Sequence, residues 1–223
     1  MSGVTPGAEH LPGGSCHSAI TLTDKQGLPY VLRLLETSDT EALERFFRSL
    51  SREAKRMFRP YPFTVEMAGK LARAIDPRKR LILVSTTILG DTETIVGYAF
   101  VNIAPFGGRD GALGIALLDD HTGRGLGSAL LDHLLRLVAD RKCGKVWLTA
   151  FEQNDRARRL YQRAGFVEVE SRCSLALLAL RLREGLFVYG PRLPVAYVRA
   201  VKEKDPALGR EVHMVRALKG PYG

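Results

Sequence analysis

The chain has few cysteines, one tryptophan and no long apolar run. Its 223 residues include only three cysteines, Cys16, Cys143 and Cys173. An odd number at such wide spacing fits neither a disulfide framework nor a zinc site, so we expect a reducing cytoplasm and no metal. Apolar stretches such as 175–180 are too short to span a bilayer, and the N-terminus shows no secretory-signal pattern. These absences predict a cytoplasmic protein with no membrane partner.

Acidic residues are outnumbered by basic ones. There are 33 Lys and Arg residues against 24 Asp and Glu, which gives a formal net charge of +9. Such a balance suits nucleic acid, an acidic surface or an anionic ligand. The sequence shows no long Lys/Arg block and no interleaved aromatic ladder, which argues against nucleic acid. With 45% apolar and 26% charged residues, the chain has ample material for a globular core.

The distribution of turn-forming and apolar residues predicts one domain over 29–219. Residues 1–28 are rich in Gly, Pro, Ser and Thr and are predicted to be a flexible tail. Period-two and period-3.6 apolar patterns predict about seven strands and about four helices. We expect strands over 30–35, 81–88, 94–103, 112–118, 145–151, 166–170 and 211–218. We expect helices after a capping box at Ser38 and Glu41, after Thr64, over 128–141 and over 154–164. Residues 172–208 fit helix and strand equally and form an insertion between the last two strands.

The stretch DDHTGRGLGSALL, residues 119–131, places three glycines directly before a predicted helix. Consecutive backbone N–H groups at a helix N-terminus can hold a phosphate, but a glycine cluster can also be a tight turn. Two familiar phosphate motifs are absent, because no Gly-Lys-Ser/Thr follows and the third glycine of G-x-G-x-x-G is replaced by Ser128 or Leu130. Taken alone, the loop leaves the turn and the phosphate seat both open.

A second motif, NDRARRLYQRAGF at 154–166, lies on the next helix. With the glycine loop, it resembles the GNAT superfamily of acyl-CoA-dependent N-acyltransferases, whose phosphate loop reads Q/R-x-x-G-x-G/A and precedes an N…A…LY…GF helix. Gly125 and Gly127 fill the glycine places, while Thr122 stands where the family has Gln or Arg. The resemblance covers about 30–218 and is strongest over 112–170. It implies an α/β (α+β) fold, with a mixed, mostly antiparallel twisted sheet flanked by helices.

The resemblance also implies a site for acetyl-CoA as co-substrate. The pyrophosphate would lie on the loop amides, and the pantetheine arm would pair with the end of the strand before the loop. Asn154 would bond the pantetheine, although an Asn there also suits a helix N-cap. The expected cofactor-binding residues are Leu117, Leu118, Asp119, Arg124, Gly125, Leu126, Gly127, Ser128, Asn154 and Arg158.

The same resemblance assigns Tyr161 as the catalytic acid that protonates the leaving thiolate. The alternative is a tyrosine that only packs on the helix's apolar face. The attacking amine must also lose a proton, and some relatives use a Glu where this chain has Thr149. No base is assigned among the acidic and histidine side chains expected nearby, which are Asp119, Asp120, His121 and Glu152.

The implied activity is transfer of an acetyl group from acetyl-CoA to a primary amine within a ternary complex. The acceptor could be a small-molecule amine, an amino sugar or a protein amine. The basic and aromatic segment 52–63 and the insertion 172–208 would lie near it, the latter as a lid, a homodimer contact or an embellishment. Two other functions stay open: a CoA-binding module without turnover, and a nucleic-acid-associated protein.

Overall fold

The protein folds around one mixed sheet, seen in a computed structural model that describes residues 19–58, 60–103, 110–141, 143–169 and 211–218. The sheet has eight strands in the order β1-β2-β3-β4-β5-β6-β8-β7. Neighbouring strands in the sheet are antiparallel, apart from the parallel pair β5 and β6. The strands are β1 Ile20–Thr23, β2 Pro29–Leu34, β3 Arg80–Leu89, β4 Thr92–Ile103, β5 Asp110–Leu117, β6 Lys145–Phe151, β7 Val167–Val169 and β8 Glu211–Ala217. The predicted α/β class and the seven expected strands are confirmed, and β1 is the eighth.

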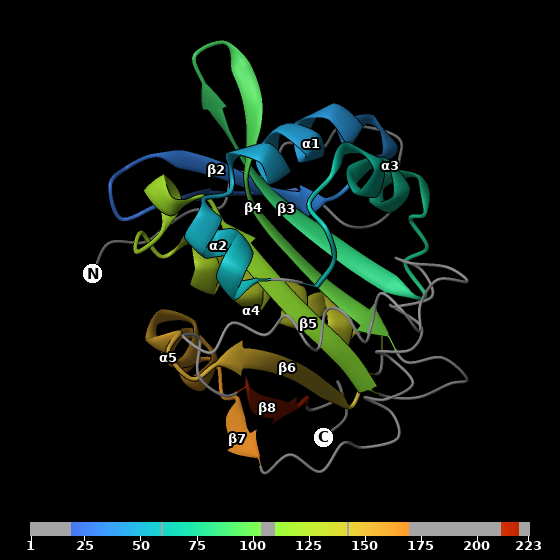
Figure 1. Cartoon of the computed structure of the whole chain (residues 1–223), viewed down its shortest axis with the longest axis vertical. Helices are drawn as coiled ribbons and strands as arrows, with labels where there is room; N and C mark the ends of the chain where they lie inside the picture. The colour runs from blue at the N-terminus through green and yellow to red at the C-terminus, as the bar shows by residue number, and fades with distance from the viewer. Residues whose placement is uncertain (1–18, 59, 104–109, 142, 170–210, 219–223) are drawn as a thin grey trace.

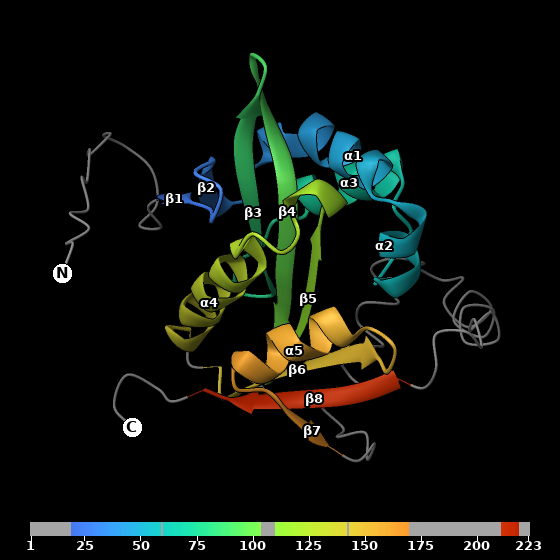
Figure 2. The same ribbon diagram turned by 90° about the vertical axis from the view of Figure 1, so that its left-hand side faces the viewer.

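Helices cover both faces of the sheet (Figure 2). One face carries α4 and α5, which bury a core with β5, β6 and β8, and the other carries α1, α2 and α3. The helices are α1 Thr40–Ser49, α2 Arg52–Met57, α3 Val65–Arg73, α4 Leu126–Ala139 and α5 Asp155–Arg163. Across the described ranges, none of these helices is long and apolar enough to cross a membrane. The predictions for 1–18 and 172–208, including a lid or homodimer contact, lie outside the described residues.

Helix α2 is the one that the sequence pattern missed. It spans six residues and buries none of them, so it leaves no apolar periodicity to detect. Its start is set by Ser51, whose side chain accepts a hydrogen bond from the Ala54 amide at 3.0 Å. The start of α3 at Thr64 agrees with prediction, since the Thr64 hydroxyl accepts from the Met67 amide.

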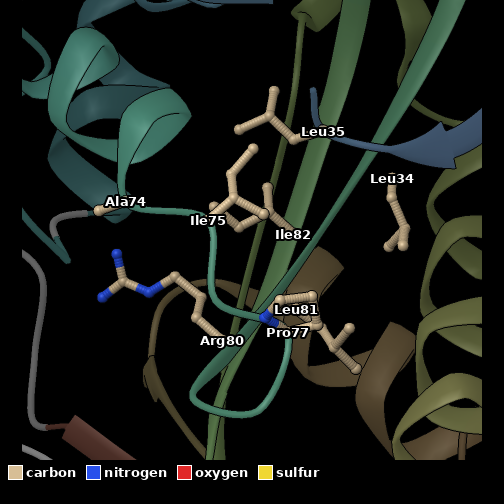
Figure 3. A pocket seen from close by; sticks show the side chains of 8 residues that line it. All are labelled: Leu34, Leu35, Ala74, Ile75, Pro77, Arg80, Leu81 and Ile82. Carbon is tan, nitrogen blue, oxygen red and sulfur yellow. The ribbon is translucent and has the colours of Figure 1, made fainter. Parts of the chain in front are cut away.

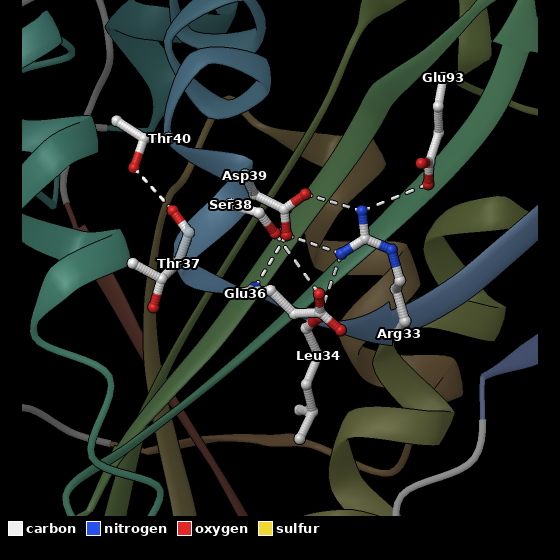
Figure 4. A network of polar contacts seen from close by, with 8 residues as sticks. All are labelled: Arg33, Leu34, Glu36, Thr37, Ser38, Asp39, Thr40 and Glu93. Carbon is white, nitrogen blue, oxygen red and sulfur yellow. Dashed lines mark hydrogen bonds and ion pairs between the residues drawn. The ribbon is translucent and has the colours of Figure 1, made fainter. Parts of the chain in front are cut away.

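The capping box before α1 lies two residues earlier than predicted. It uses Glu36 and Asp39 on a short 3-10 helix, Thr37–Asp39, instead of Ser38 and Glu41. Asp39 occupies this position because the Arg33 guanidinium, at the end of β2, donates two hydrogen bonds to its carboxylate, at 2.6 and 2.7 Å (Figure 4). This hydrogen-bonded carboxylate also raises the pKa of the Arg33 guanidinium. This pair of hydrogen bonds between Arg33 and Asp39 fixes the junction between β2 and α1.

Strand β1 corrects the predicted extent of the flexible tail. Residues 20–23 pair with β2 in a hairpin, although the sequence analysis placed them within the tail 1–28. Asp24 closes the hairpin by accepting hydrogen bonds from the amides of Gln26 and Leu28, and Gly27 supplies a φ of +85°. The sequence analysis missed this strand because it has only four residues and lies in a segment otherwise rich in Gly, Pro, Ser and Thr. Tertiary pairing decides its structure.

Strands β5 and β6 diverge after a short contact (Figure 1). They share three register pairs, Asp110↔Lys145, Gly111↔Val146 and Ala112↔Trp147. Strand β5 stays paired with β4 as far as Leu117, and β6 stays paired with β8 as far as Phe151. Among the described strands, the second half of β5 therefore has one edge that no strand covers.

Candidate cofactor site and catalytic centre

The glycine loop lies between the end of β5 and the start of α4. A 3-10 turn, Asp119–His121, leads into Gly123 and Gly125, which have φ of +78° and +95°. Residues that carry a side chain rarely adopt these backbone angles, so glycine is needed at both positions. The Ser128 amide already donates to the Gly125 carbonyl at 3.1 Å. The amides left for a ligand are therefore those of the first helical turn, at 125–127, where a helix supplies no acceptor of its own.

Gly127 is required for a different reason, close packing. A Cβ there would stand 3.1 Å from Leu117 Cδ1 and 3.6 Å from Leu160 Cδ2. Leu117 ends β5, Gly127 begins α4 and Leu160 lies on α5, so three elements meet at this one glycine. The structure thus brings the two sequence motifs together at the diverging end of β5.

The residues predicted to bind pantetheine, 117–119, differ in whether their backbone groups already have hydrogen-bond partners. The Leu118 amide donates to the Val96 carbonyl of β4 at 2.9 Å, so this donor is used within the sheet. The Asp119 carbonyl accepts from the Thr122 amide at 3.0 Å and hydroxyl at 2.8 Å. Because backbone groups alternate along a strand, Leu117 directs its amide and carbonyl to the edge opposite β4. Leu117 is therefore the residue of this stretch best placed to pair with an added strand.

The N-terminus of α5 contributes Asn154 and two arginines. The Asn154 side-chain oxygen accepts from the Ala157 amide at 3.1 Å, so Asn154 is an N-cap. Arg158 bonds Glu168 on β7 at 2.7 Å and the Glu152 carbonyl at 3.2 Å. Arg156, which the sequence analysis did not single out, donates to the Thr122 hydroxyl at 2.5 Å. Sequence reasoning missed Arg156 because helical spacing alone does not show which arginine of α5 faces the loop.

The β1–β2 hairpin contacts the glycine loop through Asp24, Lys25 and Tyr30. We call these three residues, together with His121 and Arg124 of the loop, the brace. The Tyr30 hydroxyl lies 2.8 Å from His121 Nδ1 and 3.2 Å from the Asp24 carboxylate. Arg124 approaches the same carboxylate at 3.7 Å, and the Arg124 carbonyl accepts from the Lys25 amide at 3.2 Å. Sequence reasoning missed these contacts because it placed Asp24 and Lys25 in the tail. His121, one of the groups considered as a base, belongs to this brace.

Burial and hydrogen bonding set the charges within the brace. Burial lowers the pKa of His121, and the nearby Arg124 lowers it further. Burial acts to raise the pKa of Asp24, but hydrogen bonds from the Leu28 and Gln26 amides and Tyr30 outweigh it and hold the pKa below its usual value. Burial, followed by the bond to Asp24, raises the pKa of Tyr30. Near neutral pH the brace holds an ionised carboxylate, a protonated phenol and a neutral imidazole.

Tyr161 lies on the inner face of α5. Its side chain is buried, and its ring meets that of Phe166 edge-on at 5.9 Å between centroids. Burial raises the pKa of the phenol well above its ordinary value, so the hydroxyl keeps its proton. The structure shows a packing residue, and the retained proton is what the predicted role as an acid would require.

The opposite face of the β5–β6 junction is polar and aromatic. Trp147 donates to the Asp110 carboxylate at 2.9 Å, and the Thr149 hydroxyl lies 3.3 Å from His213 Nδ1. Here Phe58, from the segment 52–63, packs so closely on β5 that a Cβ at Gly114 would come within 2.8 Å of its ring. This face lies on the side of α1, α2 and α3, away from the buried side chain of Tyr161.

An apolar hollow at the other end of the sheet is separate from this site (Figure 3). It lies between the ends of α3 and β2 and the start of β3. Arg80 on its rim pairs with Asn102 near the end of β4, whereas Leu117 pairs with Gly97 in the middle of the same strand. Within the described part of the chain, no group of three or more His, Cys, Asp or Glu side chains could hold a metal ion.

Comparison with known proteins agrees with this arrangement. The model of the acetyltransferase (GNAT) family matches residues 41–166. The spermine/spermidine N(1)-acetyltransferase of Bacillus subtilis (strain 168) is 37% identical over 79 residues, which are 32% of this chain and 52% of that protein. A probable spermine N(1)-acetyltransferase of the natto strain matches to the same extent. The chain thus spans about half the length of the curated relatives it matches.

Solved structures share the fold at low sequence identity. The GNAT domain of S. lividans PAT has a TM-score of 0.65 at 16% identity, over 90% of this chain and 97% of that one. The spermidine N-acetyltransferase of Vibrio cholerae, solved with CoA and spermine, has a TM-score of 0.56 at 17% identity, over 85% of this chain and 95% of that one. The family match spans more than half of the chain, and the glycine loop, the diverging strands and the Asn–Tyr helix all lie within the shared fold. This chain belongs to the GNAT acetyltransferase family.

Proposed function

We propose that this protein transfers the acetyl group of acetyl-CoA to a primary amine by direct attack within a ternary complex. One observation carries the proposal: Leu117, Gly127 and Leu160 meet, which joins the glycine loop, the uncovered edge of β5 and the helix of Tyr161. Relatives named as spermine or spermidine acetyltransferases support acetyl transfer to a small amine. The neighbour solved with CoA and spermine supports the cofactor.

The residues of the loop fit a CoA pyrophosphate. Gly125 has a left-handed backbone conformation at the start of α4. The amides of 125–127 have no acceptor within the helix, so they point out of its N-terminus. The positive end of the α4 dipole adds to their attraction for a phosphate. An extended pantetheine arm would pair with the uncovered edge of β5 from Leu117, as an added strand does. Bound there, acetyl-CoA supplies an acetyl group activated as a thioester.

Tyr161 would hold the proton that the departing sulfur needs. A thiol has an ordinary pKa of about 8.5, so a thiolate leaves more readily when a donor stands near it. Burial raises the pKa of the phenol, so it keeps its proton across the neutral range and could donate a hydrogen bond to the sulfur as charge develops there. Tyr161 lies one residue after Leu160, whose side chain already packs beside the loop.

The amine would approach from the face that carries Trp147, Thr149 and His213. A lysine-like amine has a pKa of about 10.4 and must lose a proton before it attacks. Thr149 bears no carboxylate, so the proton would leave through this polar face to solvent. The aromatic rings around Phe58 and Phe100 form an apolar wall beside it.

The test of the cofactor comes first. Thermal unfolding with and without acetyl-CoA should show stabilisation, of about 2.7 kcal/mol at 100 times the dissociation constant. An unchanged melting temperature, with no binding by calorimetry, would rule out both acetyl transfer and the CoA-binding module.

A thiol-release assay then separates an enzyme from a binding module. The amine panel should hold spermine, spermidine, an amino sugar and a peptide with a free N-terminus, with water as the blank. Amine-dependent release of CoA that falls in Tyr161→Phe supports acetyl transfer. Tight CoA binding with no release for any amine would instead favour a module without turnover.

A further inference from the structure

Arg156 meets the phosphate loop at the one position where this chain departs from the family's loop motif. We propose that Arg156, reaching across from α5, supplies the side-chain contact to the CoA pyrophosphate that Thr122 cannot make. The proposal rests on the proposed function, because it concerns the same cofactor site. It assigns a binding role to a residue outside the loop.

The helix positions Arg156 for this role. Arg156 precedes Leu160 by one turn of α5, and Leu160 packs on the loop at Gly127. Its guanidinium donates to Thr122 Oγ1 at 2.5 Å, and that hydroxyl donates in turn to the Asp119 carbonyl. Thr122 thus holds the arginine beside the loop without itself facing a ligand.

The hydrogen-bond partner of Arg156 also distinguishes it from the neighbouring arginines. Arg124 lies 3.7 Å from the Asp24 carboxylate, and Arg158 lies 2.7 Å from that of Glu168. The contact that the structure gives Arg156 is with a neutral hydroxyl, and none of the ion pairs among the described residues involves this arginine. A guanidinium has five N–H donors in a planar fork that suits two phosphate oxygens, and the bond to Thr122 uses one of them.

Arg158 lies on a different side of the helix. Two residues advance roughly 200° around an α-helix, so Arg156 and Arg158 flank the buried face from opposite sides. Arg158 faces β7 through Glu168, while Arg156 faces the loop. Arg156 and Arg159 are both exposed, and Arg159 provides a control of equal charge on the same helix.

Calorimetric binding to the full chain tests the proposal with three probes: CoA, dephospho-CoA and pantetheine. Loss of a charge-assisted hydrogen bond typically costs about 10- to 100-fold in affinity. We expect Arg156→Gln to weaken CoA and dephospho-CoA by the same factor in this range, and to leave pantetheine unchanged. Arg159→Gln should bind all three as wild type does. Adding Thr122→Arg to Arg156→Gln should restore affinity, because it returns the arginine to the loop.

The outcomes separate this proposal from the one it rests on. If wild type binds CoA and Arg156→Gln binds it equally well, Arg156 has no such role while the proposed function stands. A loss seen with CoA but absent with dephospho-CoA would mean a 3′-phosphate contact and overturn the pyrophosphate assignment. An equal loss in Arg159→Gln would reduce the effect to general charge and overturn it too. If wild type itself does not bind CoA, both proposals fail. Unchanged thermal unfolding of each free variant controls for folding.

Discussion

Gly125→Ala is the sharpest single test of whether the loop is a phosphate seat or only a turn. The nearest atom to an added Cβ is Lys25 Cε at 3.7 Å, so the methyl group has room. The cost is conformational, because φ is +95° and a side chain in the left-handed region costs about 1–2 kcal/mol. For a chain of this size, we expect a fall in Tm of about 2–8 °C.

The variant should also lose affinity for CoA. Rotation of the backbone at Gly125 relieves the strain but turns the following amides away from the ligand. Losing one charge-assisted hydrogen bond to a phosphate costs about 1.5–3 kcal/mol, so the Kd should rise about 10- to 100-fold. Calorimetric titration with CoA measures the affinity, and thermal unfolding without ligand measures the strain.

Gly90→Ala is the matched control. Gly90 has a φ of +63° in the β3–β4 hairpin, with no atom within 4 Å of an added Cβ. It should lose stability for the same reason but bind CoA as wild type does. If Gly125→Ala loses stability and still binds CoA with wild-type affinity, the loop is a structural turn and the seat lies elsewhere.

Three further predictions concern the acid, the brace and the aromatic wall. Tyr161→Phe should lower kcat about 100-fold with Kd for CoA unchanged, and equal kcat at pH 6–9 would contradict the acid role. The lowered pKa of His121 means that unfolding takes up a proton below about pH 6.5, so its contribution to stability is present above that pH and lost as pH falls. Urea unfolding at several pH values should show this slope in wild type and a shallower one in His121→Gln. Gly114→Ala would place a Cβ 2.6 Å from Phe100, so we expect a loss of about 1–3 kcal/mol and a higher KM for the amine.

Local patterns predicted most of the sheet and four of the five described helices. The strand 145–151 and the helix start at Thr64 agree with the structure to the residue, because apolar alternation and an N-cap are properties of neighbouring residues. Strand β1 and helix α2 are too short for such a pattern to stand out. Strand β1 has four residues and helix α2 has six, none of them buried, and each owes its structure to contacts with distant parts of the chain or to a single cap.

The site shows the same division. The glycine loop and the α5 motif could be predicted because their residue types are tied to particular backbone shapes. Which arginine of α5 meets the loop could not, because Arg156 and Arg158 differ only in the side of the helix that they occupy. That choice depends on how α5 packs against β5 and α4, which the spacing of residues in one helix does not specify.

The brace explains how the loop can keep two left-handed glycines without a ligand. Gly123 and Gly125 give the loop backbone freedom, and that freedom would have to be lost when a phosphate binds. Tyr30 anchors the loop at His121, while Asp24 and Lys25 anchor it at Arg124, so the hairpin holds both ends. The conformational cost is then met during folding, by burial of Tyr30 and the Asp24 side chain, rather than during binding. The hairpin that the sequence analysis assigned to a tail is therefore the element that pre-organises the glycine loop.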